Sequence, residues 1–170
     1  MTYADHIHRS GGTPVAQEYI GLEEGEFTVG VLSFGDGTEA GSIALRRSLD
    51  AKLSVMSRGR GGLVSSGYSQ GYIGDFPAIR ERAESMARAV GSRGALNIQG
   101  RVRAGELIPF EVNPRLSAST YLRALAGFNE VDILLQHAAF AHVPPPYAIR
   151  EGWYLRSLTE RYVAPEEVRT

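Results

Sequence analysis

Four polar residues in the second half of the chain have the types and spacing to hold a metal ion beside a phosphate group. They are Gln99, Glu111, Asn113 and Arg115. Side chains alternate between the two faces of a strand, so Glu111 and Asn113 project from the same face. If residues 104–106 form a three-residue loop, Gln99 lies directly opposite Glu111 in a hairpin. The three side chains then offer the hard oxygen ligands that Mg²⁺ requires, and Arg115 can contact a phosphate bidentately.

Spacing alone favours a simpler interpretation of these residues, namely the solvated face of a polar hairpin that ends at an Asn-Pro turn. Their order carries more information. Gln99, followed twelve residues later by Glu-Val-Asn-Pro-Arg over residues 111–115, resembles the signature of ATP-grasp domains in the large subunit of carbamoyl phosphate synthetase. Residues 116–120 and 124–129 are similar to the helix and turn that follow that signature.

The resemblance implies a role for each residue of the signature. Gln99 and Glu111 would bind Mg²⁺ or Mn²⁺, and Asn113 would complete the second metal site. Arg115 would contact the terminal phosphates of ATP. Gln99 is therefore predicted as both a metal ligand and a cofactor-binding residue, and Asn113 and Arg115 as the residues closest to catalysis.

A second resemblance lies upstream, in residues 14–20 and 25–29. In ATP-grasp proteins a strand of this kind is the hinge whose backbone meets the adenine edge, and the carboxylate that opens the next strand binds the ribose. The resemblance thus implies that Glu18, Tyr19 and Ile20 frame the base and that Glu26 holds the sugar. Taken alone, the first segment is only a strand with a polar edge, and Glu26 is more often a solvated charge.

The resemblance extends from about Pro14 to Phe140 and implies an α+β fold, the C-terminal lobe of an ATP-grasp domain without its N-terminal lobes. A flexible segment over residues 1–13 would precede this lobe, which would span residues 14–170. The implied activity is phosphoryl transfer from ATP to a small carboxylate substrate, giving an acyl phosphate that an amine or ammonia attacks. Such chemistry needs positioning and charge neutralisation rather than a protein nucleophile.

Three interpretations of this partial resemblance remain open. The chain is one part of a split ligase whose missing lobes come from a second polypeptide, a non-catalytic nucleotide-binding or scaffold remnant, or a fragment that self-associates as a homodimer. Because nucleotide pockets enclose most of their ligand, we expect weak or no activity from the chain alone. The acceptor substrate is not specified by the sequence.

The elements that position these residues follow from hydrophobic periodicity and turn residues. The order does not show the strict alternation of a parallel doubly wound sheet, so we expect an α+β fold with an antiparallel sheet and packed helices. Asp75 is expected to cap the first long helix. Strands are predicted over residues 15–20, 27–34, 43–49, 95–102, 107–112 and around 152–158, and helices over 76–90, 120–126 and 130–140.

Composition excludes several functional classes. The net charge of −1 gives no general attraction to nucleic acid or anionic membranes, and the chain has no cysteine for thiolate chemistry or disulfides. No apolar run approaches the roughly 20 residues that span a bilayer, so we expect a cytoplasmic protein. The Gly- and Arg-rich segment 58–62 is expected to be a disordered surface loop, with a phosphate or substrate clamp as the alternative, and it does not match a P-loop.

Overall fold

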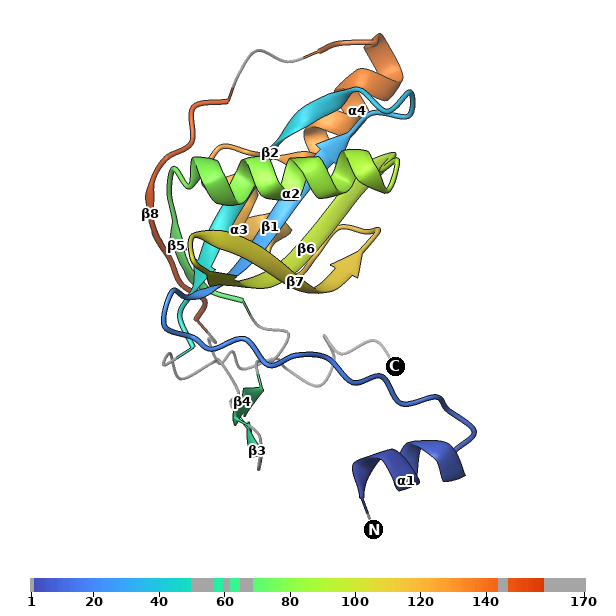
Figure 1. Ribbon diagram of the computed structural model, residues 1–170. Coiled ribbons are helices and arrows are strands. Elements are labelled where there is room, and N and C mark those ends of the chain that lie inside the picture. Colours follow the sequence, from blue (N-terminus) through green and yellow to red (C-terminus); the bar gives the residue numbers. More distant parts are fainter. Residues whose placement is uncertain (1, 50–56, 60–61, 65–68, 144–146, 158–170) are drawn as a thin grey trace, which may run out of the picture.

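The core of the computed structural model is one antiparallel sheet of six strands in the order β7-β6-β1-β2-β5-β8 (Figure 1). The structure describes residues 2–49, 57–59, 62–64, 69–143 and 147–157. The six strands are β1 (Glu26–Ser33), β2 (Glu39–Arg47), β5 (Gly71–Ile73), β6 (Gly94–Arg103), β7 (Glu106–Asn113) and β8 (Gly152–Tyr154). The α+β class and the antiparallel sheet predicted from the sequence are confirmed.

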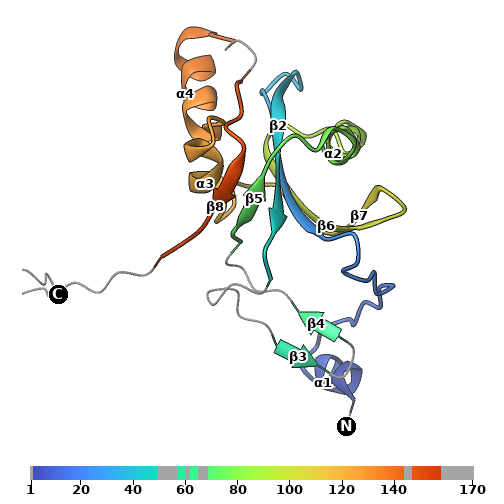
Figure 2. The same cartoon turned by 90° about the vertical axis from the view of Figure 1, so that its left-hand side faces the viewer.

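Helices cover both faces of this sheet, which Figure 2 views nearly edge on. Helix α2 (Pro77–Ala89) lies against one face, and α3 (Thr120–Leu125) and α4 (Glu130–Phe140) lie against the other. A short helix, α1 (Tyr3–Arg9), lies away from the sheet near the N-terminus. The small hairpin of β3 (Ser57–Gly59) and β4 (Gly62–Val64) lies outside the main sheet.

Strand β1 is buried along its whole length because both of its faces are covered. Phe27, Val29 and Val31 of this strand belong to one apolar cluster with Ile79, Ala83 and Ala87 of α2. On the other face, Leu32 joins a second apolar cluster with residues of α3 and α4. Each face of the sheet therefore has its own core, and alternation along β1 decides which residue enters which core.

The face under α3 and α4 changes from apolar to polar along the strands. On β1, Leu32 is followed in order by Gly30, Thr28 and Glu26 on this face, all of them buried. On β2 the apolar Ile43 and Leu45 give way to Arg47 in the same way. One half of this face thus packs against the helices, and the other half carries polar side chains.

Three local predictions differ from the structure, and a fourth expectation, a flexible segment over residues 1–13, is not tested by it. Residues 15–20 are an irregular segment rather than a strand, and Phe76, not Asp75, is the N-cap residue of α2. Strand β5 was not predicted, because Gly71–Ile73 is only three residues long and lies in a Gly-rich context. Part of the segment predicted to be flexible forms α1, where Thr2 and Asp5 make a reciprocal capping box.

For two further expectations, the described residues give only part of the answer. The predicted loop at residues 58–62 includes positions 60 and 61, which lie outside the described residues, as do all residues after Ser157. In the part of the chain that the structure describes, no helix has the length and apolar character to cross a bilayer.

Gly30 provides a test of how closely the helices pack on the polar–apolar boundary. A Cβ at this position would contact Arg123 Nη1 and lie 2.6 Å from Glu130 Oε1, both of them in a buried ion pair. We expect Gly30→Ala to lower the free energy of unfolding by about 2 kcal/mol, because the core must shift to accept the methyl group. Urea unfolding measures this change.

Gly35→Ala is the matched control, since a Cβ there meets nothing within 4 Å. Equal stabilities of the two variants would contradict the packing inferred at Gly30.

Candidate functional site

The hairpin of β6 and β7 places Gln99 directly opposite Glu111, as predicted. The turn and the register that produce this pairing differ from the prediction. Arg103 pairs with Glu106, so the turn contains two residues rather than three, and a bulge beside Gln99 shifts the register by one residue. The two irregularities cancel, so the predicted loop length is wrong and the predicted pairing is confirmed.

The turn itself is held by a carboxylate from outside the hairpin. Ala104 and Gly105 both have positive φ, at 52° and 76°, the conformation of a tight two-residue hairpin turn. Their backbone N–H groups donate to the two oxygens of Glu24, at 2.7 and 2.8 Å. Glu24 thereby fixes the turn of the hairpin, whose strands carry the candidate site.

Glu111 is the centre of the candidate site. Its Oε2 accepts from Gln99 Nε2 at 2.9 Å, and its Oε1 accepts from Asn113 Nδ2 at 2.7 Å. One carboxylate and two carboxamides from adjacent strands thus converge on one edge of the sheet. As metal ligands the two amides would present oxygen instead of nitrogen, which requires only a half-turn about their terminal torsion.

This donor set fits a hard cation with water and phosphate in its remaining positions. It contains a single carboxylate, so it would contribute little charge of its own. Within the described residues no group of three or more histidine, aspartate or glutamate side chains is placed to hold a metal ion.

Gln99, Glu111 and Asn113 form a row of contacting polar side chains, and Arg47 extends this row onto β2. Its Nη1 donates to Glu26 Oε1 at 2.6 Å and to Gln99 Oε1 at 3.4 Å. Burial lowers the pKa of Arg47, and the nearby carboxylates of Glu26 and Glu111 oppose that shift. Because side chains alternate along β2, only one of Arg46 and Arg47 can face this row, and Arg47 is the one that does.

Glu26 lies under two arginines. It is 1% exposed, and its second oxygen accepts from Arg101 Nε at 2.9 Å. A sugar hydroxyl could reach either carboxylate oxygen only by displacing Arg47 or Arg101. Glu26, the carboxylate expected to hold the ribose, therefore lies in this row with both of its oxygens bonded to arginines.

Glu18, Tyr19 and Ile20, the residues expected to frame a base, are held by side chains of β6 rather than by pairing with a strand. Arg101 Nη1 donates to the Ile20 carbonyl at 2.6 Å, and its guanidinium carbon lies 4.9 Å from the centre of the Tyr19 ring. Glu18 pairs with Arg103 at 2.7 Å. A continuous series of contacts therefore joins Ile20 through Arg101 and Glu26 to the Gln99–Glu111 pair.

Arg115 is not part of that series. It is exposed, and its Nη1 donates to the neighbouring Leu116 carbonyl at 3.1 Å. The series of contacts thus forms one connected row from Ile20 to Asn113. Arg115 lies just beyond the Asn113 end of this row.

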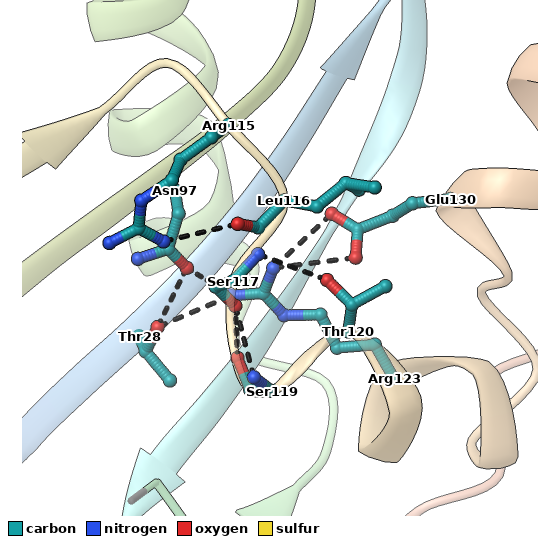
Figure 3. A network of polar contacts seen from close by, with 9 residues as sticks. All are labelled: Thr28, Asn97, Arg115, Leu116, Ser117, Ser119, Thr120, Arg123 and Glu130. Atoms are coloured by element: carbon teal, nitrogen blue, oxygen red, sulfur yellow. Dashed lines mark hydrogen bonds and ion pairs between the residues drawn. The ribbon is translucent and has the colours of Figure 1, made fainter. Parts of the chain in front are cut away.

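A second polar network, which the sequence did not reveal, lies between the sheet and the helices (Figure 3). Arg123 is 1% exposed, and its Nη1 donates to the two Glu130 oxygens at 3.2 and 3.4 Å. Its Nη2 donates to Thr28 Oγ1 at 3.2 Å and to Asn97 Oδ1 at 2.6 Å. Burial lowers the pKa of Arg123, and the Glu130 carboxylate opposes this shift.

Asn97 connects the two polar systems. It is the cross-strand partner of Asn113 on one side and of Gly30 on the other. Its oxygen accepts from both Arg123 and Thr28, so the orientation of its carboxamide is fixed. The available signal was the pair of polar residues Thr28 and Asn97, which lie at buried positions of two neighbouring strands.

Comparisons with protein-family models, with curated proteins and with solved structures found no match to this chain. The interpretation of the site therefore depends on the residues themselves and on the resemblance of their order to the ATP-grasp signature.

The buried ion pair predicts an asymmetric mutational response. Arg123→Leu leaves Glu130 buried without its cation, and we expect a loss of about 3–5 kcal/mol in the free energy of unfolding. The double variant Arg123→Leu/Glu130→Leu should be more stable than Arg123→Leu, because no charge is left unpaired. Chemical unfolding of both proteins measures the difference.

The more exposed pair Arg88–Glu39, at 2.8 Å, is the control. Arg88→Gln should cost about 0–1 kcal/mol, as expected for a surface ion pair. A double variant less stable than Arg123→Leu would contradict this prediction, because it would show that Glu130 left without its cation is not destabilising.

Proposed function

We propose that this chain is the ATP- and Mg²⁺-binding part of an ATP-grasp ligase that joins a carboxylate to an amine or ammonia. The observation that carries the proposal is the convergence of Gln99 and Asn113 on the Glu111 carboxylate. The same residues form the signature recognised in the sequence, in the same order. Glu111 is also exposed at the sheet edge, where a large ligand can reach it.

The residues have distinct proposed roles. Gln99, Glu111 and Asn113 hold Mg²⁺ or Mn²⁺, which supplies charge neutralisation on the phosphates when bound. Arg115, whose exposed guanidinium lies past the end of β7, contacts the terminal phosphate bidentately. Asn113 and Arg115 position the phosphoryl group for in-line attack by a carboxylate oxygen of the substrate, with ADP as the leaving group.

A partner is part of the proposal. The described residues beside Glu111 form one side of a nucleotide site, so a second polypeptide or a second copy of the chain would supply the opposite side. Activity should then depend on that partner, and the chain alone should bind ATP weakly.

A non-catalytic nucleotide-binding or scaffold remnant is the second candidate. The position of Glu26 favours it, because both carboxylate oxygens are already paired with arginines. A site that retains the metal ligands but has replaced its ribose contact with internal ion pairs would bind phosphate groups and lack ligase activity.

The test is calorimetric titration of the chain with ATP in the presence of Mg²⁺. We expect Glu111→Gln to weaken binding at least about tenfold, because it removes the only carboxylate of the metal site. Glu106→Gln, an exposed position on the same strand, is the control and should bind as the wild type does. Unchanged Mg·ATP affinity in Glu111→Gln would falsify the assignment.

The ribose contact can be tested separately with 2′,3′-dideoxy-ATP. Because Arg47 and Arg101 occupy both oxygens of Glu26, we expect ATP and the dideoxy analogue to bind with equal affinity. A clear preference for ATP that disappears in Glu26→Gln would restore the ribose role implied by the resemblance. No ATP binding by the folded chain would favour the remnant or a strict requirement for the partner.

A further inference from the structure

A cavity of about 290 Å³ lies at the edge of the sheet where β5 separates from β2, apart from the Glu111 row. This volume greatly exceeds the roughly 10–15 Å³ that one ordered water requires. The cavity is lined by three groups of residues: Ser42, Ile43 and Ala44 of β2, Gly74, Asp75 and Arg80 around the start of α2, and Tyr147, Ile149 and Glu151 before β8.

Part of the lining, Ser42–Ala44 of β2, pairs with β1 but with no second strand among the described residues. Strand β5 pairs with β2 only at Leu45, Arg46 and Arg47, after which the chain turns away at Gly74. In an antiparallel sheet, the N–H and C=O groups of alternate residues point to opposite neighbours. Over Ser42–Ala44, some of these groups must therefore point away from β1 and toward the cavity, where a ligand can satisfy them.

One wall of the cavity carries a positioned cation. Arg80 Nε donates to Ser42 Oγ at 3.0 Å, and Ser42 Oγ donates in turn to Glu84 Oε1 at 2.5 Å. Arg80 Nη1 lies 3.6 Å from Asp75 Oδ1, an ion pair too long for a good hydrogen bond. Nε alone has a hydrogen-bond acceptor among the described residues, so the guanidinium keeps N–H groups for an anion.

Another wall carries a positioned carboxylate. Glu151 Oε2 accepts from the Tyr72 hydroxyl at 3.1 Å. A Cβ at position 74 would lie 3.2 Å from this oxygen, so glycine lets the carboxylate approach the chain closely. Ile43 and Ile149 add apolar residues to the lining beside these charged groups.

We propose that this cavity binds a small zwitterion of the α-amino acid class. The ligand carboxylate pairs with Arg80, and its ammonium group pairs with Glu151, with Asp75 nearby. A simple cation would have to lie beside Arg80, and a simple anion beside two carboxylates, so neither matches the charges of the lining as well. The site is distinct from the ATP site proposed above and does not depend on it.

The test uses ¹⁵N NMR of the whole chain titrated with glycine, L-alanine and L-glutamine. We expect saturable shifts of the backbone amides at Gly74, Arg80 and Glu151 with at least one of them. The charge-blocked analogues N-acetyl-L-alanine and L-alaninamide separate the two charges without any mutation. Each should bind about tenfold or more weakly than the parent amino acid, because each lacks one charged contact.

Substitutions give a second readout. Arg80→Gln and Glu151→Gln should each weaken binding by about tenfold or more. Arg82→Gln, on the exposed side of the same helix, should leave it unchanged, as should Glu111→Gln at the proposed ATP site. The inference is overturned if no amino acid gives saturable shifts, if either blocked analogue binds as well as alanine, or if neither substitution at the cavity changes the affinity.

Discussion

The buried ion pair of Arg123 and Glu130 is the interaction on which the arrangement of this fold depends. Arg123 comes from α3, Glu130 from α4, and the acceptors Thr28 and Asn97 come from β1 and β6. A guanidinium without these partners would carry a large desolvation cost, so every element that supplies a partner must be in place. The pair thus specifies how the two short helices sit on the sheet, even where its net contribution to stability is small.

The same pair marks the boundary between the structural and the chemical halves of one sheet face. Gly30 and Asn97 are cross-strand partners at the level of Arg123, and Gly30 has no side chain to obstruct the guanidinium. On one side of this level, Leu32 and its neighbours pack against α3 and α4. On the other side, Arg47 joins Glu26 to Gln99, and Gln99 in turn donates to Glu111. The helices cover the apolar half, and the row, buried at Glu26 and Arg47, becomes exposed only at Glu111 on the sheet edge.

Local patterns in the sequence predicted most strands of this sheet but not the long-range side-chain contacts that hold other segments to it. The β6–β7 hairpin followed from alternation and a Gly-containing turn, and Gln99 met Glu111 because the short turn and the bulge shift the register in opposite directions. The segment before Ile20 has strand composition, yet Arg101 and Arg103 hold it through their side chains. Arg123 contacts Thr28 across 95 positions of sequence, a separation at which periodicity carries no information.

Electrostatics constrains what the Glu111 row can bind. From Glu26 to Glu111, two carboxylates are balanced by two arginines, Arg47 and Arg101, so the row has no excess negative charge. A divalent cation at Glu111 would lie near the Arg47 guanidinium, whose Nη1 is 3.4 Å from the Gln99 oxygen, and repulsion would weaken its binding. A phosphate-bearing ligand reverses that balance, because its charge is attracted by both the metal and the arginine. Under the proposed function, metal and nucleotide would therefore bind this row together far better than either binds alone.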